Sequence, residues 1–246
     1  MSEKSKTWIQ TAEYHTHTFY SDGKSTMEDN VIAARNCGIK TIGISDHGYR
    51  HMGFGVSYRD YPKMKDEVLK LRDKYPDMEI LLGVEANILD DTGLIDVDDY
   101  ILRYVDYVMA GYHFGSSITK PRGLRNHVCN FIKPLKRFEV DYNTRALINA
   151  MKQNDLFILT HPGDKGDIDT KEVAKVAMET GTILEINTHH ANLSAAQLSL
   201  IKDWDLKFSV GADAHRSEHI GNLEVALKNI REAGLSLDKV INLKED

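Results

Sequence analysis

Cysteine is scarce in this sequence: the 246 residues include only Cys37 and Cys129, which are far apart and form no CxxC motif. This scarcity argues against a disulfide framework and against a thiolate-rich structural zinc site, and it favours a reducing compartment. No apolar run is long enough to span a bilayer, and the first ten residues, MSEKSKTWIQ, lack the apolar stretch of a signal peptide. We therefore expect a cytoplasmic protein that does not bind membranes.

An excess of basic residues is also missing. Lys and Arg number 31 against 37 Asp and Glu, which gives a formal net charge of −6. The sequence thus lacks the basic footprint of a protein that binds long nucleic acids. A phosphorylated small molecule remains compatible with this charge, because bound cations would change the local potential.

Short apolar runs alternate with amphipathic segments along the whole chain. The predicted strands are residues 12–18, 40–47, 79–88, 107–114, 156–163, 182–188 and 207–215. The predicted helices include residues 25–38, 59–75, 143–154, 169–181 and 194–204. Such alternation is typical of a parallel sheet with helical crossovers, and seven strands suit a closed or nearly closed barrel. No linker or repeat interrupts the pattern, so we expect one domain over residues 1–246.

Polar residues that can bind metal ions recur where these strands end. Six of the eleven histidines and three carboxylates lie at such positions. They are His15, His17, Asp46, His47, Glu85, His113, His161, Asp213 and His215. The carboxyl ends of parallel strands open on one rim, where α/β barrels place their active sites.

The stretch HTHTFYSDG illustrates why the repetition matters. His15 and His17 share one face of a strand, but an isolated HxH pair is more often two solvated histidines. Buried strand ends that converge with imidazoles and carboxylates would leave uncompensated polar groups unless something binds them. A group of metal ions is the simplest explanation, and imidazole with carboxylate ligands suits zinc, iron and manganese.

The motifs HTHTFYSDG, ISDHG, GVEANI, AGYHFG, LTHPG, LEINT and GADAH occur in this order over residues 15–215. In them the sequence resembles the PHP family, named for polymerase and histidinol phosphatase, and most closely its YcdX-type phosphatase branch. The resemblance implies an α/β fold, a distorted (β/α)7 barrel, with a metal site at the C-terminal ends of the strands. It also implies a trinuclear centre, usually of zinc or manganese.

The resemblance assigns the ligands of three metal ions. One ion would be bound by His15, His17, Glu85 and Asp213, and Glu85 would bridge to a second ion held by His113 and His161. The third would be bound by Asp22, His47 and His215.

Asp22 departs from the closest branch, where a histidine commonly stands near this position. Aspartate makes the third site richer in oxygen, which favours manganese, iron or magnesium. An aspartate in an SDG turn can alternatively serve only to fix the turn by accepting backbone N–H bonds. Asp46 faces away from its neighbour His47, and it would either orient a ligand or cap the following turn.

Two to three divalent ions (zinc, manganese or iron) would support hydrolysis of a small phosphorylated metabolite. In two-metal hydrolases the ions activate a water and neutralise charge on the phosphoryl oxygens, so hydroxide attacks phosphorus directly. We assign the catalytic roles to Glu85, His161 and Asp213. No GxSxG motif or phosphate-binding glycine-rich loop is present.

Cationic side chains near the rim are candidates for phosphate binding. Arg50 and Arg216 follow strand ends, and Arg122 with Arg125 lies in a segment that we expect to form a loop and act as a lid. Arginine binds phosphate well because it forms bidentate hydrogen bonds. His189 follows the LEINT strand and is a further candidate, as is its neighbour His190. Each of these side chains has the alternative of an ordinary surface position.

Other functions remain open at this point. Histidinol-phosphate phosphatase activity and nucleotide phosphodiesterase activity are enzymatic alternatives. A metal-binding regulatory module without catalysis is a third, although ligands are intact at every motif. A homo-oligomer is compatible with the sequence.

Overall fold

Seven parallel strands form one continuous sheet in the computed structural model, which describes residues 8–190 and 193–246. The order along the sheet follows the chain, β2-β3-β4-β5-β6-β7-β8, and every neighbouring pair is parallel. The strands are β2 (Ala12–Glu13), β3 (Thr41–Ile44), β4 (Glu79–Asn87), β5 (Tyr107–Gly111), β6 (Ile158–Leu159), β7 (Ile183–Asn187) and β8 (Phe208–Gly211). The predicted distorted seven-stranded barrel is confirmed.

The first and last strands of the sheet meet just beyond their ends. Thr16 and Ala214 form a parallel bridge. The backbone N–H of His17 donates to the carbonyl of Ala214 at 3.0 Å, and that of Ala214 donates to His15 at 3.1 Å. The barrel is therefore nearly closed at the rim where β2 and β8 end.

Below the rim, side chains join β2 to β8, and we call this junction of the first and last strands the seam. The amide of Asn242 donates to the carbonyls of Ala12 and Val210 at 2.8 and 2.7 Å, and its oxygen accepts from the N–H of Val210 at 2.9 Å. The buried carboxylate of Glu13 accepts from the N–H of Ala212 at 3.0 Å. Asn242 thus occupies the place of a strand residue between β2 and β8, which do not pair there directly.

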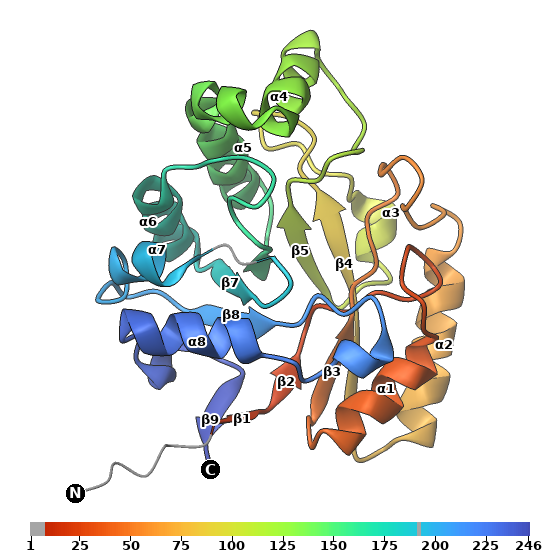
Figure 1. Ribbon diagram of the computed structural model, residues 1–246. Helices are drawn as coiled ribbons and strands as arrows, with labels where there is room; N and C mark the ends of the chain where they lie inside the picture. Colours follow the sequence, from red (N-terminus) through yellow and green to blue (C-terminus); the bar gives the residue numbers. More distant parts are fainter. Residues whose placement is uncertain (1–7, 191–192) are drawn as a thin grey trace, which may run out of the picture.

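Helices surround the sheet, with α1, α2 and α3 on one side and α5 to α8 on the other (Figure 1). Their bounds are α1 (Met27–Asn36), α2 (Tyr61–Lys74), α3 (Asp99–Leu102), α4 (Pro121–Phe131), α5 (Val140–Gln153), α6 (Thr170–Thr180), α7 (Ala195–Ser199) and α8 (Glu224–Ala233). The 3-10 helices are η1 (Lys133–Phe138), η2 (Ser217–His219) and η3 (Leu237–Lys239). Thr26 and Asp169 cap α1 and α6, and Gly181 ends α6 in the left-handed conformation.

Two parts of the sequence-based prediction are wrong. The segment with Arg122 and Arg125 belongs to helix α4 and not to a loop, because Pro121 starts a helix whose polar residues pack inward. Two strands of the sheet are also shorter than predicted, because β2 and β6 comprise two residues each. They leave the ladder early because the chain then turns to present site residues.

A second, antiparallel sheet was not predicted. It pairs β1 (Trp8–Gln10) with β9 (Leu243–Glu245), far apart in sequence and side by side at the bottom of Figure 1. The hydrophobic core consists mainly of apolar strand residues and the helix faces above them, with Ile42, Leu82 and Phe208 fully buried. Cys37 and Cys129 are both free. No helix among the described residues is long and apolar enough to cross a membrane.

Candidate metal centre

The nine predicted ligands converge at the rim where the parallel strands end. His15 and His17 follow β2, His47 follows β3, His113 follows β5, and His161 follows β6. Glu85 lies within β4, while Asp213 and His215 follow β8. Seven of the nine are buried, namely His15, His17, His47, Glu85, His113, His161 and Asp213.

Six of these residues form what we call the inner group: His15, His17, Glu85, His113, His161 and Asp213. His17 Nε2 lies 3.1 Å from Asp213 Oδ1, and His15 Nε2 lies 3.4 Å from the same oxygen. Glu85 Oε1 lies 3.3 Å from His15 Nε2, and Glu85 Oε2 lies 3.6 Å from His17 Nε2. The predicted ligands of the first ion therefore point at one another.

Glu85 also contacts the two remaining members of the inner group. Its Oε1 lies 3.2 Å from His113 Nε2 and 2.9 Å from His161 Nε2. Those two ring nitrogens are 3.3 Å apart. Glu85 accordingly lies between two sets of donors, as a carboxylate that bridges two cations must.

Asp22, His47 and His215 form the outer group. Asp22 Oδ2 lies 3.2 Å from His215 Nε2, and Asp22 Oδ1 lies 3.7 Å from His47 Nε2. His17 joins this set, with its Nδ1 4.0 Å from Asp22 Oδ1. His47 Nδ1 lies 2.9 Å from Glu85 Oε2, so the outer group adjoins the inner one.

Metal ions fit these donors. Several buried polar atoms have no well-directed hydrogen bond within the described chain: His15 Nε2, both ring nitrogens of His17, His47 Nδ1, Glu85 Oε2 and Asp213 Oδ1. Sets of three or four donor atoms lie within 4.8 Å of one another, including His17, Asp22, His47 and His215 together. Orphaned donors of this kind are costly unless a cation binds them. The nitrogen and oxygen donors suit zinc, iron or manganese.

The electrostatics of the inner group favour bound positive charge. Burial alone would raise the pKa of Glu85, but His113 and His15 hold it well below its ordinary value. Burial would likewise raise the pKa of Asp213, which His15 and His17 hold well below its ordinary value. Although burial opposes it, Glu185, Asp213 and Glu85 raise the pKa of His15 well above its ordinary value. Two buried carboxylates thus remain charged and attract a cation into the space between them.

A second layer of side chains orients the inner group. Glu185 Oε1 lies 2.7 Å from His15 Nδ1, and its Oε2 accepts the backbone N–H of His161 at 2.8 Å. Asn87 Oδ1 lies 2.9 Å from His113 Nδ1. Such contacts leave the opposite ring nitrogen free to face a metal.

Glu185 was missed by sequence reasoning, although the LEINT motif contains it. The available signal was its position two residues before Asn187, which places both side chains on the same face of β7. Thr160, which donates to Glu85 Oε1 at 2.8 Å, was missed as well.

Backbone strain coincides with the site. His161 and Asp213 have φ values of 29° and 49°, and of the described non-glycine residues only Leu193 shares such a positive value. Residues without glycine's freedom adopt this region at a cost that the surrounding structure must offset, and such residues cluster at functional sites. The strain turns each side chain inward at the point where its strand ends.

The turn that carries Asp22 is fixed by other residues. Asp46 accepts the N–H and hydroxyl of Thr18, each at 2.7 Å, and the hydroxyl of Ser21 at 2.5 Å. Gly23 lies so close to the strand that a Cβ there would be 2.5 Å from the carbonyl carbon of His17. Asp46 therefore performs the turn-fixing role that sequence analysis had left open for Asp22.

A cavity of about 200 Å³ opens over the centre. Five of its lining residues are not predicted ligands: His51, Phe54, Phe114, Lys165 and His190. None of the four predicted arginines lines it among the described residues. Arg122 and Arg125 instead contact the buried carboxylate of Glu139, at 2.5 and 3.5 Å.

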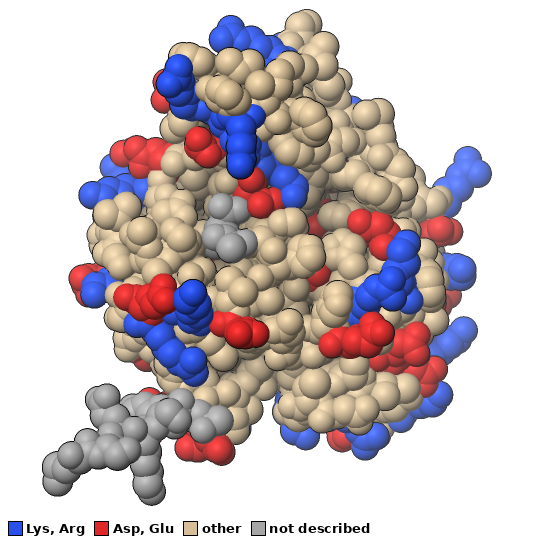
Figure 2. Space-filling view, in the orientation of Figure 1, with Lys and Arg blue, Asp and Glu red and all other residues tan. Residues whose placement is uncertain are grey.

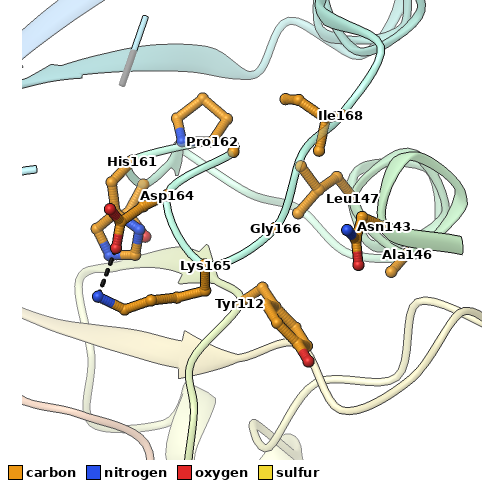
Figure 3. Close-up of a pocket in the computed structure, with 12 residues that line it drawn as sticks. Tyr112, Asn143, Ala146, Leu147, His161, Pro162, Asp164, Lys165, Gly166 and Ile168 are labelled. Atoms are coloured by element: carbon orange, nitrogen blue, oxygen red, sulfur yellow. Dashed lines mark ion pairs between the residues drawn. The ribbon is translucent and has the colours of Figure 1, made fainter. Parts of the chain in front are cut away.

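Lys165 and His190 enter the cavity from the loop after β6 and the segment after β7. Lys165 forms an ion pair with Asp164, beside His161 (Figure 3). His190 Nδ1 lies 3.2 Å from Asp164, and its Nε2 lies 3.3 Å from Asp213 Oδ2. His189, the other candidate after the LEINT strand, lines a neighbouring cavity with His219, because consecutive residues point in different directions.

A (β/α)7 barrel whose strand ends converge in histidines and carboxylates defines a class of metal-dependent hydrolases. The family model of the PHP domain matches residues 13–189, and the chain belongs to this family. The predicted family is confirmed.

Related proteins match most of this chain, and a solved structure shares its fold. The chain is 34% identical over 238 residues to a protein named "Probable phosphatase" from Thermoanaerobacter sp. strain X514, covering 93% of this chain and 88% of the relative. A protein of the same name from Tolumonas auensis is 30% identical over 243 residues, with 93% and 87% covered. The fold is similar to that of a histidinol phosphate phosphatase from Lactococcus lactis solved with zinc, L-histidinol and phosphate, at a TM-score of 0.65, 15% identity, and coverage of 93% and 95%. The predicted activity class, a metal-dependent phosphoesterase, is confirmed.

Proposed function

We propose that this protein is a phosphatase that hydrolyses a small phosphomonoester with two to three divalent ions, zinc, manganese or iron. The observation that carries the proposal is Glu85, whose two oxygens lie between His15, His113 and His161 on one side and His17 and His47 on the other. The inner group would hold two ions and the outer group a third. Bound ions at such spacing would lower the pKa of a water molecule and neutralise charge on phosphoryl oxygens.

The overall reaction is a balanced hydrolysis. The oxygen of water forms a bond to phosphorus while the bond from phosphorus to the ester oxygen breaks. The alcohol leaves with one proton, and inorganic phosphate keeps the other. Direct attack by water suits a site in which no serine or cysteine side chain lines the described part of the cavity.

The chain's own residues would position the phosphate. Lys165 is the only lysine or arginine among the described residues that line the cavity, and Asp164 holds its ammonium group in place. Its charge would bind a phosphoryl oxygen within this cavity. Lys165 therefore takes the role that sequence analysis assigned to Arg50, Arg122, Arg125 and Arg216, which all lie outside this lining.

The surface supports a small substrate. On the face shown in Figure 2, Lys and Arg side chains gather near α4 and are interspersed with Asp and Glu over the rest of the surface. A long nucleic acid would need a continuous basic track. The free cysteines support a reducing, cytoplasmic setting as part of the proposal. Histidinol phosphate ranks below an unspecified ester, because only a likeness in fold connects this chain to that substrate.

Metal analysis combined with a phosphatase screen tests the proposal. We expect the purified protein to contain roughly two to three equivalents of zinc, manganese or iron, as in multinuclear hydrolases. Removal with a chelator should abolish phosphate release, and added metal should restore it. A content below about one equivalent, with no activity after metal is added back, would refute the catalytic reading.

Lys165→Met tests the proposed phosphate contact. Loss of a charge-assisted hydrogen bond should raise KM about 10-fold with a smaller change in kcat. Lys171→Met, at an exposed position in α6, serves as the matched control and should behave like the parent protein. An unchanged KM in Lys165→Met would assign the phosphate to other residues.

A further inference from the structure

Asp96 is a buried carboxylate outside the set of predicted metal ligands. A hairpin beyond β4, in which Ile88 and Ile95 form an antiparallel bridge, returns the chain to it. Its oxygens accept the backbone N–H of Asn87 at 2.6 Å, that of Arg50 at 2.8 Å and the side-chain amide of Asn87 at 2.7 Å. The residue is 2% exposed, and no lysine or arginine side chain pairs with it in the described part of the chain. A buried carboxylate without a cation is costly, so we expect it to have a specific role.

The hairpin holds Asp96 in a fixed place. At its tip, a Cβ at Gly93 would lie 2.3 Å from the carbonyl carbon of Asn149 in α5, and the amide of Asn149 donates to the carbonyl of Asp91 at 2.8 Å. At its base, a Cβ at Gly48 would lie 2.3 Å from Asp96 Oδ1. The glycine of the ISDHG motif thus leaves room for this carboxylate beside the strand ends.

The partners of Asn87 determine which way its side-chain amide points. Asn87 Nδ2 lies 2.7 Å from the carboxylate of Asp96 and 3.3 Å from the carbonyl of Gly48. Both of these groups can only accept hydrogen bonds, so the NH2 of the amide must lie on this side. The contact to Asp96 is the shorter one and involves a charged acceptor, which makes it the stronger. Asp96 therefore turns Asn87 Oδ1 toward His113 Nδ1, at 2.9 Å.

This orientation selects one tautomer of His113. An amide oxygen only accepts, so the proton of the neutral imidazole lies on Nδ1. His113 Nε2 then keeps its electron pair, and it faces Glu85 Oε1 at 3.2 Å and His161 Nε2 at 3.3 Å. A histidine that binds a metal through Nε2 needs this tautomer. A rotated amide of Asn87 would present N–H to Nδ1 and favour the tautomer that cannot bind.

We propose that Asp96 is a positioning residue of the metal centre, which fixes the amide of Asn87 and thereby the metal-binding tautomer of His113. The inference rests on the metal ions of the proposed function and adds a residue that acts only through another. Asp96 lies nine residues after Asn87, and the hairpin brings the two together. The competing explanation is that Asp96 merely ties the hairpin to the loop after β3 through the backbone N–H of Arg50.

Zinc binding tests the inference on the whole chain, by titration against a fluorescent zinc indicator. In Asp96→Asn, either orientation of the introduced amide sets N–H against N–H, so Asn87 loses its fixed orientation. We expect one inner zinc equivalent to bind about 10-fold more weakly, at the low end for residues that orient ligands. Asp99→Asn, at an exposed position in the first turn of α3, is the matched control and should bind zinc like the parent protein.

The two ways in which this titration can fail are distinguishable. Failure of the parent protein to bind zinc would overturn the proposed function and the inference with it. Unchanged zinc binding by Asp96→Asn would overturn the inference alone, and so would an equal loss in Asp99→Asn.

A double-mutant cycle separates positioning from a structural tie. Asn87→Ala removes the amide through which Asp96 acts, and we expect it to weaken zinc binding about 10-fold as well. Asp96→Asn should then add nothing in the Asn87→Ala background, because the two changes break one chain of contacts. Additive losses of about 100-fold in the double variant would show that Asp96 acts through its backbone contacts, and the inference would be wrong.

An exchange of the two side chains supplies a rescue. In Asp96→Asn combined with Asn87→Asp, the introduced amide donates to the introduced carboxylate, whose second oxygen still accepts from His113 Nδ1. We expect zinc affinity within about threefold of the parent protein, against about 10-fold losses in each single variant. This pair decides the question even if Asp96→Asn alone does not fold, as judged by circular dichroism. A pair that does not fold, or that binds zinc no better than the single variants, would leave Asp96 as a structural tie.

Discussion

The inner and outer groups of the metal centre use the same kinds of side chain but are built differently. Inner side chains are at most 6% exposed, whereas those of Asp22 and His215 are 18% and 31% exposed. The inner residues lie on or directly beyond strands of the barrel, and Asp22 lies in a turn. The barrel itself therefore organises the inner group together with His47 and His215, whereas Asp22 of the outer group depends on a turn.

The hydrogen bonds that orient the predicted ligands also differ between the inner and outer groups. Glu185, Asn87 and Thr160 each orient a member of the inner group through a hydrogen bond of 2.7 to 2.9 Å. Among the described residues, Asp22 contacts three histidines and Ser21 and accepts no backbone N–H. A site with a complete second layer binds its metal more tightly, so we expect the outer ion to be the more labile.

The largest effect should come from Glu85→Gln, which removes the charge shared by both groups while nearly preserving shape. We expect activity to fall at least ~100-fold, as for loss of an important ligand contact, with the fold intact by circular dichroism. Glu79→Gln, at the exposed start of the same strand, is the control. Near-normal turnover of Glu85→Gln would show that this residue does not bridge two ions.

A smaller loss is expected from Asp22→Asn, which affects the outer group alone. The amide lacks the charge that balances the third cation, so we expect loss of about one metal equivalent and a roughly 30-fold fall in activity. The melting temperature should change little, because Asp46 and not Asp22 fixes the turn. Metal analysis measures the loss of the third ion, and thermal melts measure the melting temperature. Asp203→Asn, at an exposed position, is the control. Full metal content with normal turnover would exclude Asp22 as a ligand.

The smallest effect should come from Glu185→Gln, which leaves every ligand in place. Glutamine keeps the contact to the N–H of His161 but weakens the orientation of His15. We expect metal affinity to fall about 10-fold, at the low end for such orienting residues. Competition with a coloured chelator measures this, and Glu172→Gln on the exposed face of α6 is the control. If excess metal fails to restore activity, Glu185 does more than orient His15.

The strand ends explain how much of the site could be predicted from sequence. His15, His47, His161 and Asp213 each follow an apolar run, and parallel topology brings such ends to one rim without any knowledge of distances. Their conformations could not be predicted, because the positive φ of His161 and Asp213 depends on neighbours from other strands.

Residues that act through tertiary contacts escaped prediction. Lys165 lies in a loop whose direction depends on Asp164 and His190, and nothing local distinguishes it from other lysines. The sequence predicts a loop in place of helix α4 because the buried residues of this helix, Gly123, Asn126 and Asn130, are polar or small. An ordinary surface helix buries its apolar residues, whereas α4 buries polar and small ones. Hydrophobic periodicity therefore predicts the wrong face of α4 to be the buried one.

The seam between β2 and β8 has a consequence for the order in which the site is made. His15 emerges from the ribosome almost two hundred residues before Asp213, and Asn242 comes later still. Because Asn242 bridges the two strands, the pair of ligands that meet across the seam can settle only after Asn242 has been synthesised. Domains synthesised from the N-terminus form their most distant contacts last. A nascent chain that has not yet reached Asn242 therefore carries its histidines without the closed seam that completes the cluster.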